Sequence, residues 1–452
     1  MPRTLFAIAC LATLLAAGST AAPFAAAESA ASSASSTSPE STSSAAPGTA
    51  AAQSFDLDSV VDATIDDVQS WWAEQLPDVY GDEYEPIPDD RLFPYSEDDP
   101  PPSCGQGGSV PYEEVAGNAF YCSEGDFVAW DEQELFPRLE EKYGSFAVAL
   151  VLAHEWGHVI QQRTSSRITA TIYLEVQADC FAGSWAQHVE DDDVSLPIED
   201  LDRDIALAGF LEFRDPPGVD PSQQGAHGNA FDRVSAFQDG FEDGTDRCAA
   251  YEENPPEVTE TSFTSQEDYA TGGDLPLDEA IDLIRPDLDD YWSTELGGDS
   301  PVQDVVADAN ASCDGRSDRG VLVDDVTFCS SDDTVRYDPD TLEQVYDSSG
   351  DFGAGMVLAA AWSSGAMHEM GLSLASEAAH TKADCLTGSW AGDVSRGVRA
   401  RNRGDEAISL SPGDLDEGIA TFVSLGDGNG SAFSRVAAFR KGFFEGADAC
   451  TP

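Results

Sequence analysis

Basic residues are scarce in this sequence of 452 residues, which contains 22 Lys and Arg against 85 Asp and Glu and has a formal net charge of −63. A surface with this charge repels the phosphates of nucleic acids and the headgroups of anionic membranes, so we expect neither as a partner. The plainest interpretation is a strongly hydrated surface that keeps the protein soluble in molar NaCl, which a solubility series at rising salt would check.

Long hydrophobic runs are also rare, and beyond the N-terminus no segment offers about 18 uninterrupted apolar residues, so no later membrane span is expected. The N-terminal run LFAIACLATLLAAG follows a single Arg and precedes small residues with Ala-x-Ala sites, which predicts a secretory signal peptide over residues 1–27. Residues 28–53 are nearly all Ser, Ala, Thr, Pro and Gly and predict a flexible linker. We therefore expect a protein secreted to the cell exterior or the outer cell envelope, without stable membrane insertion after signal removal.

What the sequence does contain is an internal repeat, because three segments of the first half have similar counterparts in the second. The pairs are DLDSVVDATIDDVQSWWAEQL (56–76) with PLDEAIDLIRPDLDDYWSTEL (276–296), VQADCFAGSWAQHV (176–189) with TKADCLTGSWAGDV (381–394), and FDRVSAFQDGFEDGTDRC (231–248) with FSRVAAFRKGFFEGADAC (433–450). The repeat predicts two similar domains, residues 54–251 and 271–452, joined by a polar linker over residues 252–270.

The nine cysteines fit an exported protein, since eight remain once Cys10 of the signal peptide is set aside. Four cysteines of each repeat match in position, so we expect two disulfides per repeat, although four cysteines allow three pairings. The simplest pairing is Cys104–Cys122, Cys180–Cys248, Cys313–Cys329 and Cys385–Cys450.

Hydrophobic periodicity predicts that the first repeat is mostly helical. The expected helices cover residues 56–76, 145–163, 168–189, 200–213 and 231–242. The Pro-, Gly- and Asp-rich stretch 77–118 predicts loops or a short strand, and the NAFY run before Cys122 predicts a strand. The fold class expected is α+β with helix dominant.

The stretch HEWGH lies in one of these apolar helices and places two histidines four residues apart. At this spacing His154 and His158 leave the same face of the helix, where both can bind one Zn²⁺ ion, and Glu155 beside them can act as a general base. The alternative is a pair of hydrogen-bonded histidines in the core of a buried helix.

A catalytic zinc site needs a third protein ligand, which the next helix can supply. Glu175 lies at the right distance along the chain for this role, and Asp179, one turn later, is suited to hold a ligand histidine by a hydrogen bond. The alternative for both carboxylates is a solvated acidic face, but their aliphatic and aromatic neighbours favour a buried helix.

Three motifs, HEWGHVIQ, EVQADCFAGSW and GAHG followed by RVSAFQDGF, occur in this order and resemble those of the bacterial neutral zinc metallopeptidases. The resemblance covers about residues 100–250 and implies a zincin-like domain, here duplicated in tandem. It implies that His154, His158 and Glu175 are the zinc ligands and that Glu155 is the catalytic base. It assigns no definite role to His227, the histidine of GAHG.

The second repeat serves as an internal comparison. Trp156, Asp179, Cys180 and Arg233 recur there, whereas every proposed ligand and the base are replaced. The replacements are His154 by Ala360, Glu155 by Ala361, His158 by Ser364, Glu175 by His380 and His227 by Asn429. We therefore expect the second repeat to be catalytically inactive. His227 is lost with the set, which places it in the active site as a hydrogen-bond donor to the developing oxyanion; the alternative is a loop residue free to vary.

The sequence thus predicts a secreted zinc metallopeptidase that acts on a peptide or protein through a zinc-activated water, with Glu155 as general base. One alternative is a non-enzymatic exported binding or scaffold protein with a structural zinc. That site would need a fourth protein ligand, and the cysteines are taken by the expected disulfides. Another is a hydrolase of amide bonds in the cell wall.

Overall fold

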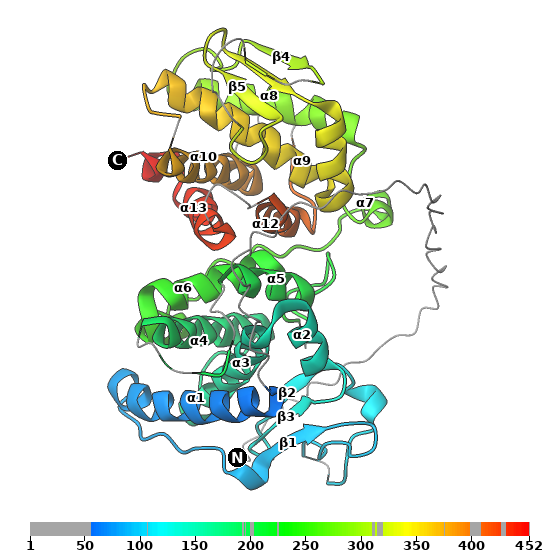
Figure 1. Cartoon of the computed structure of the whole chain (residues 1–452), viewed down its shortest axis with the longest axis vertical. Helices are drawn as coiled ribbons and strands as arrows, with labels where there is room; N and C mark the ends of the chain where they lie inside the picture. The colour runs from blue at the N-terminus through cyan, green and yellow to red at the C-terminus, as the bar shows by residue number, and fades with distance from the viewer. Residues whose placement is uncertain are drawn as a thin grey trace, which may run out of the picture.

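The computed structural model describes residues 56–451 except 106, 192–193, 195, 199–202, 224–225, 310–311, 314–319, 375, 398–407 and 426–430. The predicted signal peptide and linker, residues 1–53, lie outside these residues. Helices dominate, and two small mixed sheets accompany them (Figure 1), which confirms the helix-dominated α+β class. Among the described residues, no helix is long and apolar enough to cross a membrane.

The N-terminal part, residues 56–252, contains the predicted helices with small changes in their bounds. Its elements are α1 (Leu57–Val79), η1 (Asp89–Arg91), β1 (Leu92–Tyr95), η2 (Tyr112–Glu114), β2 (Ala119–Cys122), β3 (Phe127–Asp131), α2 (Leu135–Tyr143), α3 (Ser145–Arg163), α4 (Thr171–Asp191), α5 (Arg203–Phe213), α6 (Ala230–Ala249) and η3 (Ala250–Glu252). Strand β3 and helix α2 were not expected. Helix α6 runs past the predicted end at residue 242 because it continues through a kink at Gly244, where φ is 74°.

The C-terminal part, residues 266–451, has a similar succession of elements. These are α7 (Gln266–Thr271), α8 (Leu277–Leu296), β4 (Asp304–Ala307), β5 (Val326–Cys329), β6 (Thr334–Tyr337), α9 (Pro339–Glu369), α10 (Glu377–Arg396), α12 (Asp414–Leu425), α13 (Ala432–Glu445) and η5 (Ala447–Cys450). Helix α9 is interrupted by non-helical backbone at Ser349 and Gly350.

Each part contains a three-stranded sheet of the same topology. The strand orders are β1-β3-β2 and β4-β6-β5. In each sheet the central strand pairs in parallel with one neighbour and antiparallel with the other. Strand β2 is therefore an edge strand, and it contacts helix α3, which carries HEWGH.

Helices α3 and α4 form the buried centre of the N-terminal part. Trp156 on α3 and Trp185 on α4 are fully buried, and each indole N–H has a hydrogen-bond acceptor, Tyr84 Oη and an Asp67 carboxylate oxygen respectively. The two helices approach closely at Gly157, where an added Cβ would lie 2.7 Å from Ala178 Cα. The glycine of HEWGH thus permits the close packing that brings α4 against the two histidines.

Four disulfides cross-link the structure. They join Cys104 to Cys122, Cys180 to Cys248, Cys313 to Cys329 and Cys385 to Cys450. The Cys180–Cys248 bond ties α4 to the end of α6, so α4 is covalently held to the helix that packs along it. Disulfides of this kind persist in oxidising compartments.

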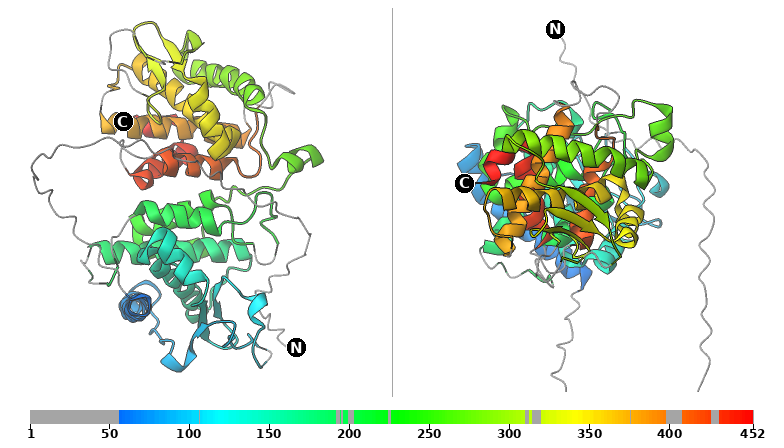
Figure 2. Two further views of the ribbon diagram at one scale, coloured as in Figure 1. Left: turned by 45° about the vertical axis from the view of Figure 1, so that its right-hand side comes forward. Right: turned by 90° about the horizontal axis from the view of Figure 1, so that it is seen from above.

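The two parts pack against each other through their last helices. Figures 1 and 2 show α5 and α6 facing α12 and α13, and aromatic rings from both parts interlock there. Phe231 contacts Phe439 and Phe443, while Phe433 contacts Phe237 and Phe241. Most buried apolar residues of both parts therefore form one continuous core, and a smaller cluster lies around the first sheet.

Candidate metal centre

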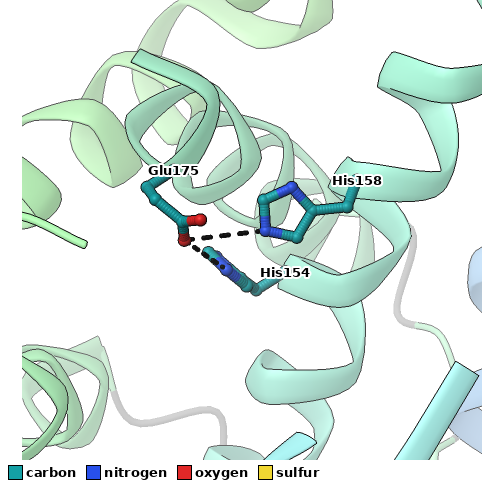
Figure 3. A group of neighbouring side chains, drawn as sticks. All are labelled: His154, His158 and Glu175. Carbon is teal, nitrogen blue, oxygen red and sulfur yellow. Dashed lines mark ion pairs between the residues drawn. The ribbon is translucent and has the colours of Figure 1, made fainter. Parts of the chain in front are cut away.

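The structure brings His154, His158 and Glu175 together between α3 and α4 (Figure 3). The Nε2 atoms of His154 and His158 lie 3.3 and 3.6 Å from the same Glu175 oxygen, Oε2. One potential ligand atom of each residue lies within 4.8 Å of the others. Two imidazole nitrogens and one carboxylate oxygen thus converge on a single point.

A buried carboxylate orients His154 through the Nδ1 atom of its ring, on the side away from Glu175. Its Nδ1 atom lies 2.7 Å from Asp179 Oδ1, and Arg233 donates to both oxygens of Asp179, at 2.8 and 2.9 Å. Burial by itself would lower the pKa of His154, but the charge of Asp179 and its hydrogen bond raise it to about 10 in the metal-free protein. The pKa of Asp179 is lowered despite its burial, because Arg233 and His154 stabilise the carboxylate.

His158 is oriented by an amide that sequence analysis missed. Gln161 Oε1 lies 2.9 Å from His158 Nδ1, and Gln161 Nε2 donates to the carbonyl oxygen of Leu174 at 2.7 Å. Because Leu174 precedes Glu175, this one side chain links both ligand-bearing helices. The only signal in the sequence was its position, three residues after His158 on the same helix.

These contacts fit a zinc ion. In both histidines a hydrogen bond holds the proton on Nδ1, so Nε2, once it gives up its own proton, can bind a metal ion at the point that faces Glu175. Imidazole and carboxylate are ordinary zinc ligands, and in the described part of the chain the group has three protein ligands, the number found in catalytic zinc sites.

Glu155 lies on α3 next to His154 and is only 6% exposed. Its Oε2 atom accepts a hydrogen bond from the backbone N–H of Tyr121, on the edge strand β2, at 2.8 Å. The contact holds one carboxylate oxygen in place and leaves Oε1 free to exchange a proton. It also joins β2 to the HEWGH helix.

His227 lies in the loop before α6, with its side chain 48% exposed. Asp215 accepts from the backbone N–H of His227 at 2.6 Å and of Gly228 at 2.9 Å, and Asp215 Oδ1 lies 3.4 Å from His227 Nδ1. The Asp215 hydrogen bond is the main cause of a raised pKa for His227, and the charge of Glu175 adds to it. The imidazole therefore lies within electrostatic range of the metal group; its catalytic role stays a prediction.

Among the described residues of the C-terminal part, the matching region has no comparable group. Ala360, Ala361 and Ser364 are buried, and Ser364 Oγ donates to a backbone carbonyl of its own helix. The ion pair between Asp179 and Arg233 does have a counterpart there, since Arg435 donates to both oxygens of Asp384 at 2.8 and 2.9 Å. The position matching His227, Asn429, lies outside the described residues.

Comparison with known proteins finds similar chains in bacteria. The chain is similar to the uncharacterized protein Rv2575 of Mycobacterium tuberculosis, 31% identical over 152 residues, which are 28% of this chain and 52% of the relative. It is also similar to the uncharacterized protein YpfJ of Escherichia coli K12, 27% identical over 169 residues, which are 31% of this chain and 54% of the relative. The chain thus spans about half the length of the curated relatives it matches.

No solved structure matches the chain. A family model does: the family described as "Putative neutral zinc metallopeptidase" matches residues 8–251, a range that includes all three residues of the metal group. With more than half of its length matched by that model, the chain belongs to this zinc metallopeptidase family.

Proposed function

We propose that the N-terminal part is a secreted zinc-dependent metallopeptidase and that His154, His158 and Glu175 hold the metal. The observation that carries the proposal is the convergence of these three side chains beside Glu155, with each histidine held at Nδ1 by a separate residue. Zinc, when bound, supplies Lewis acidity that lowers the pKa of a water towards about 7 and polarises a carbonyl group.

Residues of the chain then transfer the proton and donate the hydrogen bond that the reaction needs. Glu155, held at Oε2 by the Tyr121 N–H, takes the proton of the attacking water at Oε1 and delivers it to the leaving amine. His227, held by Asp215, donates a hydrogen bond to the negative oxygen that develops on the scissile carbonyl. Asp179 and Gln161 keep both ligand histidines in orientation throughout.

We further propose that the C-terminal part is a catalytically inactive copy, so that the chain is a tandem duplication. Three observations support this: the shared strand order, the matching Asp–Arg ion pairs, and the replacement of every proposed ligand. Secretion is supported by the predicted signal peptide and by the four disulfides.

The substrate class we propose is a peptide or protein. Cell-wall amide bonds remain the second candidate, since the same chemistry hydrolyses them. A scaffold with a structural zinc is disfavoured, because such sites are normally closed by four protein ligands and the described residues provide three.

Glu155→Gln in the full mature chain tests this function. We expect the variant to bind one zinc per chain, as measured by elemental analysis, and to lose peptidase activity against a peptide library by a factor of about 10³ or more. The matched control is Glu369→Gln, which alters the glutamate of HEMGL at the end of α9 and should change neither quantity. Full activity of Glu155→Gln would refute the proposed mechanism.

A further inference from the structure

One carboxylate of the C-terminal part reaches into the N-terminal part. Asp416 on α12 is 4% exposed. Its Oδ1 atom accepts from the backbone N–H of Phe231, in the first turn of α6, at 3.1 Å. Its Oδ2 atom lies 3.1 Å from Arg214 Nε, just beyond the end of α5. A single side chain therefore joins two separate segments of the other part.

These two segments are the ends of the loop that carries His227. Arg214 directly precedes Asp215, the residue that holds the backbone and imidazole of His227. Phe231 follows the N-cap residue Asn229 at the other end of the loop. The backbone N–H of Asp215 also donates to the carbonyl of Gly228 at 3.0 Å, which closes the loop on itself. Fixing both ends from one point thus fixes the position of the histidine.

The same helix start positions the support of His154. Arg233, two residues after Phe231, donates to Asp179 and also to the carbonyl oxygen of Phe213 at 2.9 Å. The end of α5 and the start of α6 are therefore bonded to each other through Arg233, and both contact Asp416 at the interface between the two parts.

A reciprocal contact runs the other way. Asp204 on α5 accepts from the backbone N–H groups of Ala432 and Phe433, at the start of α13, at 2.8 and 2.7 Å. Each part thus caps the last long helix of the other with an aspartate. The two contacts differ in the helix that they cap. Helix α6, capped by Asp416, carries Arg233, which is bonded to the Asp179 that holds His154, whereas α13 belongs to the part without the proposed ligands.

From this geometry we propose that Asp416 is a positioning residue for the peptidase reaction, acting through the His227 loop. The C-terminal part, which lacks the metal ligands, then completes the active site of the N-terminal part. This inference rests on the proposed function for its kinetic consequence, but its structural consequence is independent of catalysis.

The test compares Asp416→Ala with Asp204→Ala in the full mature chain loaded with zinc. Both variants remove one interface cap of the same chemical kind. We expect Asp416→Ala to speed amide hydrogen exchange in peptides that contain Arg214, Asp215 and His227 by about tenfold, while Asp204→Ala speeds exchange only at the start of α13. Both should keep one zinc per chain.

In kinetics we expect Asp416→Ala to lower kcat by about tenfold with little change in KM, because an oxyanion donor acts in the transition state, and Asp204→Ala to stay within about twofold of the wild type. Asp416→Asn keeps an acceptor for Phe231 but loses the charge that faces Arg214, so its kcat should lie between those of the two alanine variants. It replaces Asp416→Ala in the comparison if the alanine variant does not fold. Equal kinetic and exchange effects of the two alanine variants would reduce Asp416 to a structural interface residue and overturn the inference. If the wild type cleaves no peptide, the proposed function fails, and the exchange comparison still decides whether Asp416 fixes the loop.

Discussion

Asp179 and its counterpart Asp384 show at the scale of single residues what belongs to the fold and what belongs to the site. Both are fully buried and both receive two hydrogen bonds from an arginine of a later helix. Asp179 in addition lies within hydrogen-bond distance of an imidazole, at 2.7 Å from His154 Nδ1. The Asp–Arg pair therefore supports the packing of two helices in each part, and in the N-terminal part it also orients His154, the proposed metal ligand.

The sequence was informative about residues whose spacing is local. The HEWGH spacing predicts two histidines on one helix face, and Glu175 follows because the next helix folds back directly; the structure brings the three together. Tyr121 and Asp215 were not predicted to contact Glu155 and His227, since each pair joins segments whose approach depends on loops without periodicity. Such contacts become visible only when the whole chain is folded.

Gln161→Met tests the support of His158, and methionine is the residue at the matching position, Met367. The change removes the acceptor of His158 Nδ1 and the donor to Leu174, while keeping side-chain length. We expect zinc affinity to fall by about 10- to 100-fold, measured by competition with a chromophoric chelator. Gln162→Met, at an exposed position one residue later, is the control and should leave the affinity unchanged. Equal affinities for both variants would remove Gln161 from the site.

At the scale of elements, long amphipathic segments were predicted best. Helix α3 has the predicted bounds, residues 145–163. Strand β3 was missed because all five of its residues are buried, so it lacks the alternation that marks a strand with one solvated face. Helix α2 was missed because it is short and contains a proline near its start. In the C-terminal part the matching segment forms the first part of α9, before the interruption of that helix.

Gly157→Ala tests whether the close approach of α3 and α4 builds the metal centre. A methyl group at this position would lie 2.7 Å from the Cα atom of Ala178, so the helices must separate. We expect a loss of stability of roughly 1–3 kcal/mol in denaturant unfolding, together with weaker zinc binding because Glu175 moves away from the histidines. The matching residue of the C-terminal part is Ser363, and Ser363→Ala should leave zinc binding unchanged. Wild-type zinc affinity in Gly157→Ala would show that the approach is not needed.

At the scale of the whole molecule, the strongly acidic chain brings three carboxyl groups together in the C-terminal part. Carboxylates of Asp274, Asp351 and Glu417 lie within 4.8 Å of one another between α9 and α12. Burial is the main cause of the raised pKa values there, about 6 for Asp351 and about 10 for Glu417, and neighbouring carboxylates raise them further. The folded protein thus keeps protons at this cluster that the unfolded chain releases.

The consequence is that the contribution of this cluster to stability falls with rising pH. An acid whose pKa is raised by folding stabilises the protein fully below its unfolded value, near 4 to 4.5, and this contribution is lost as the pH rises towards the folded value. For Glu417 the loss extends from about pH 4.5 to about pH 10, and for Asp351 it ends near pH 6. Glu417→Gln keeps a neutral side chain of the same shape at every pH, so it should raise the melting temperature at pH 8 by several degrees and leave it nearly unchanged at pH 5. Glu343→Gln, at an exposed position of α9, provides the control. If calorimetry finds that the melting temperature of Glu417→Gln depends on pH as that of the wild type does, this carboxyl is ionised in the folded protein. The cluster would then need a positive charge beside it.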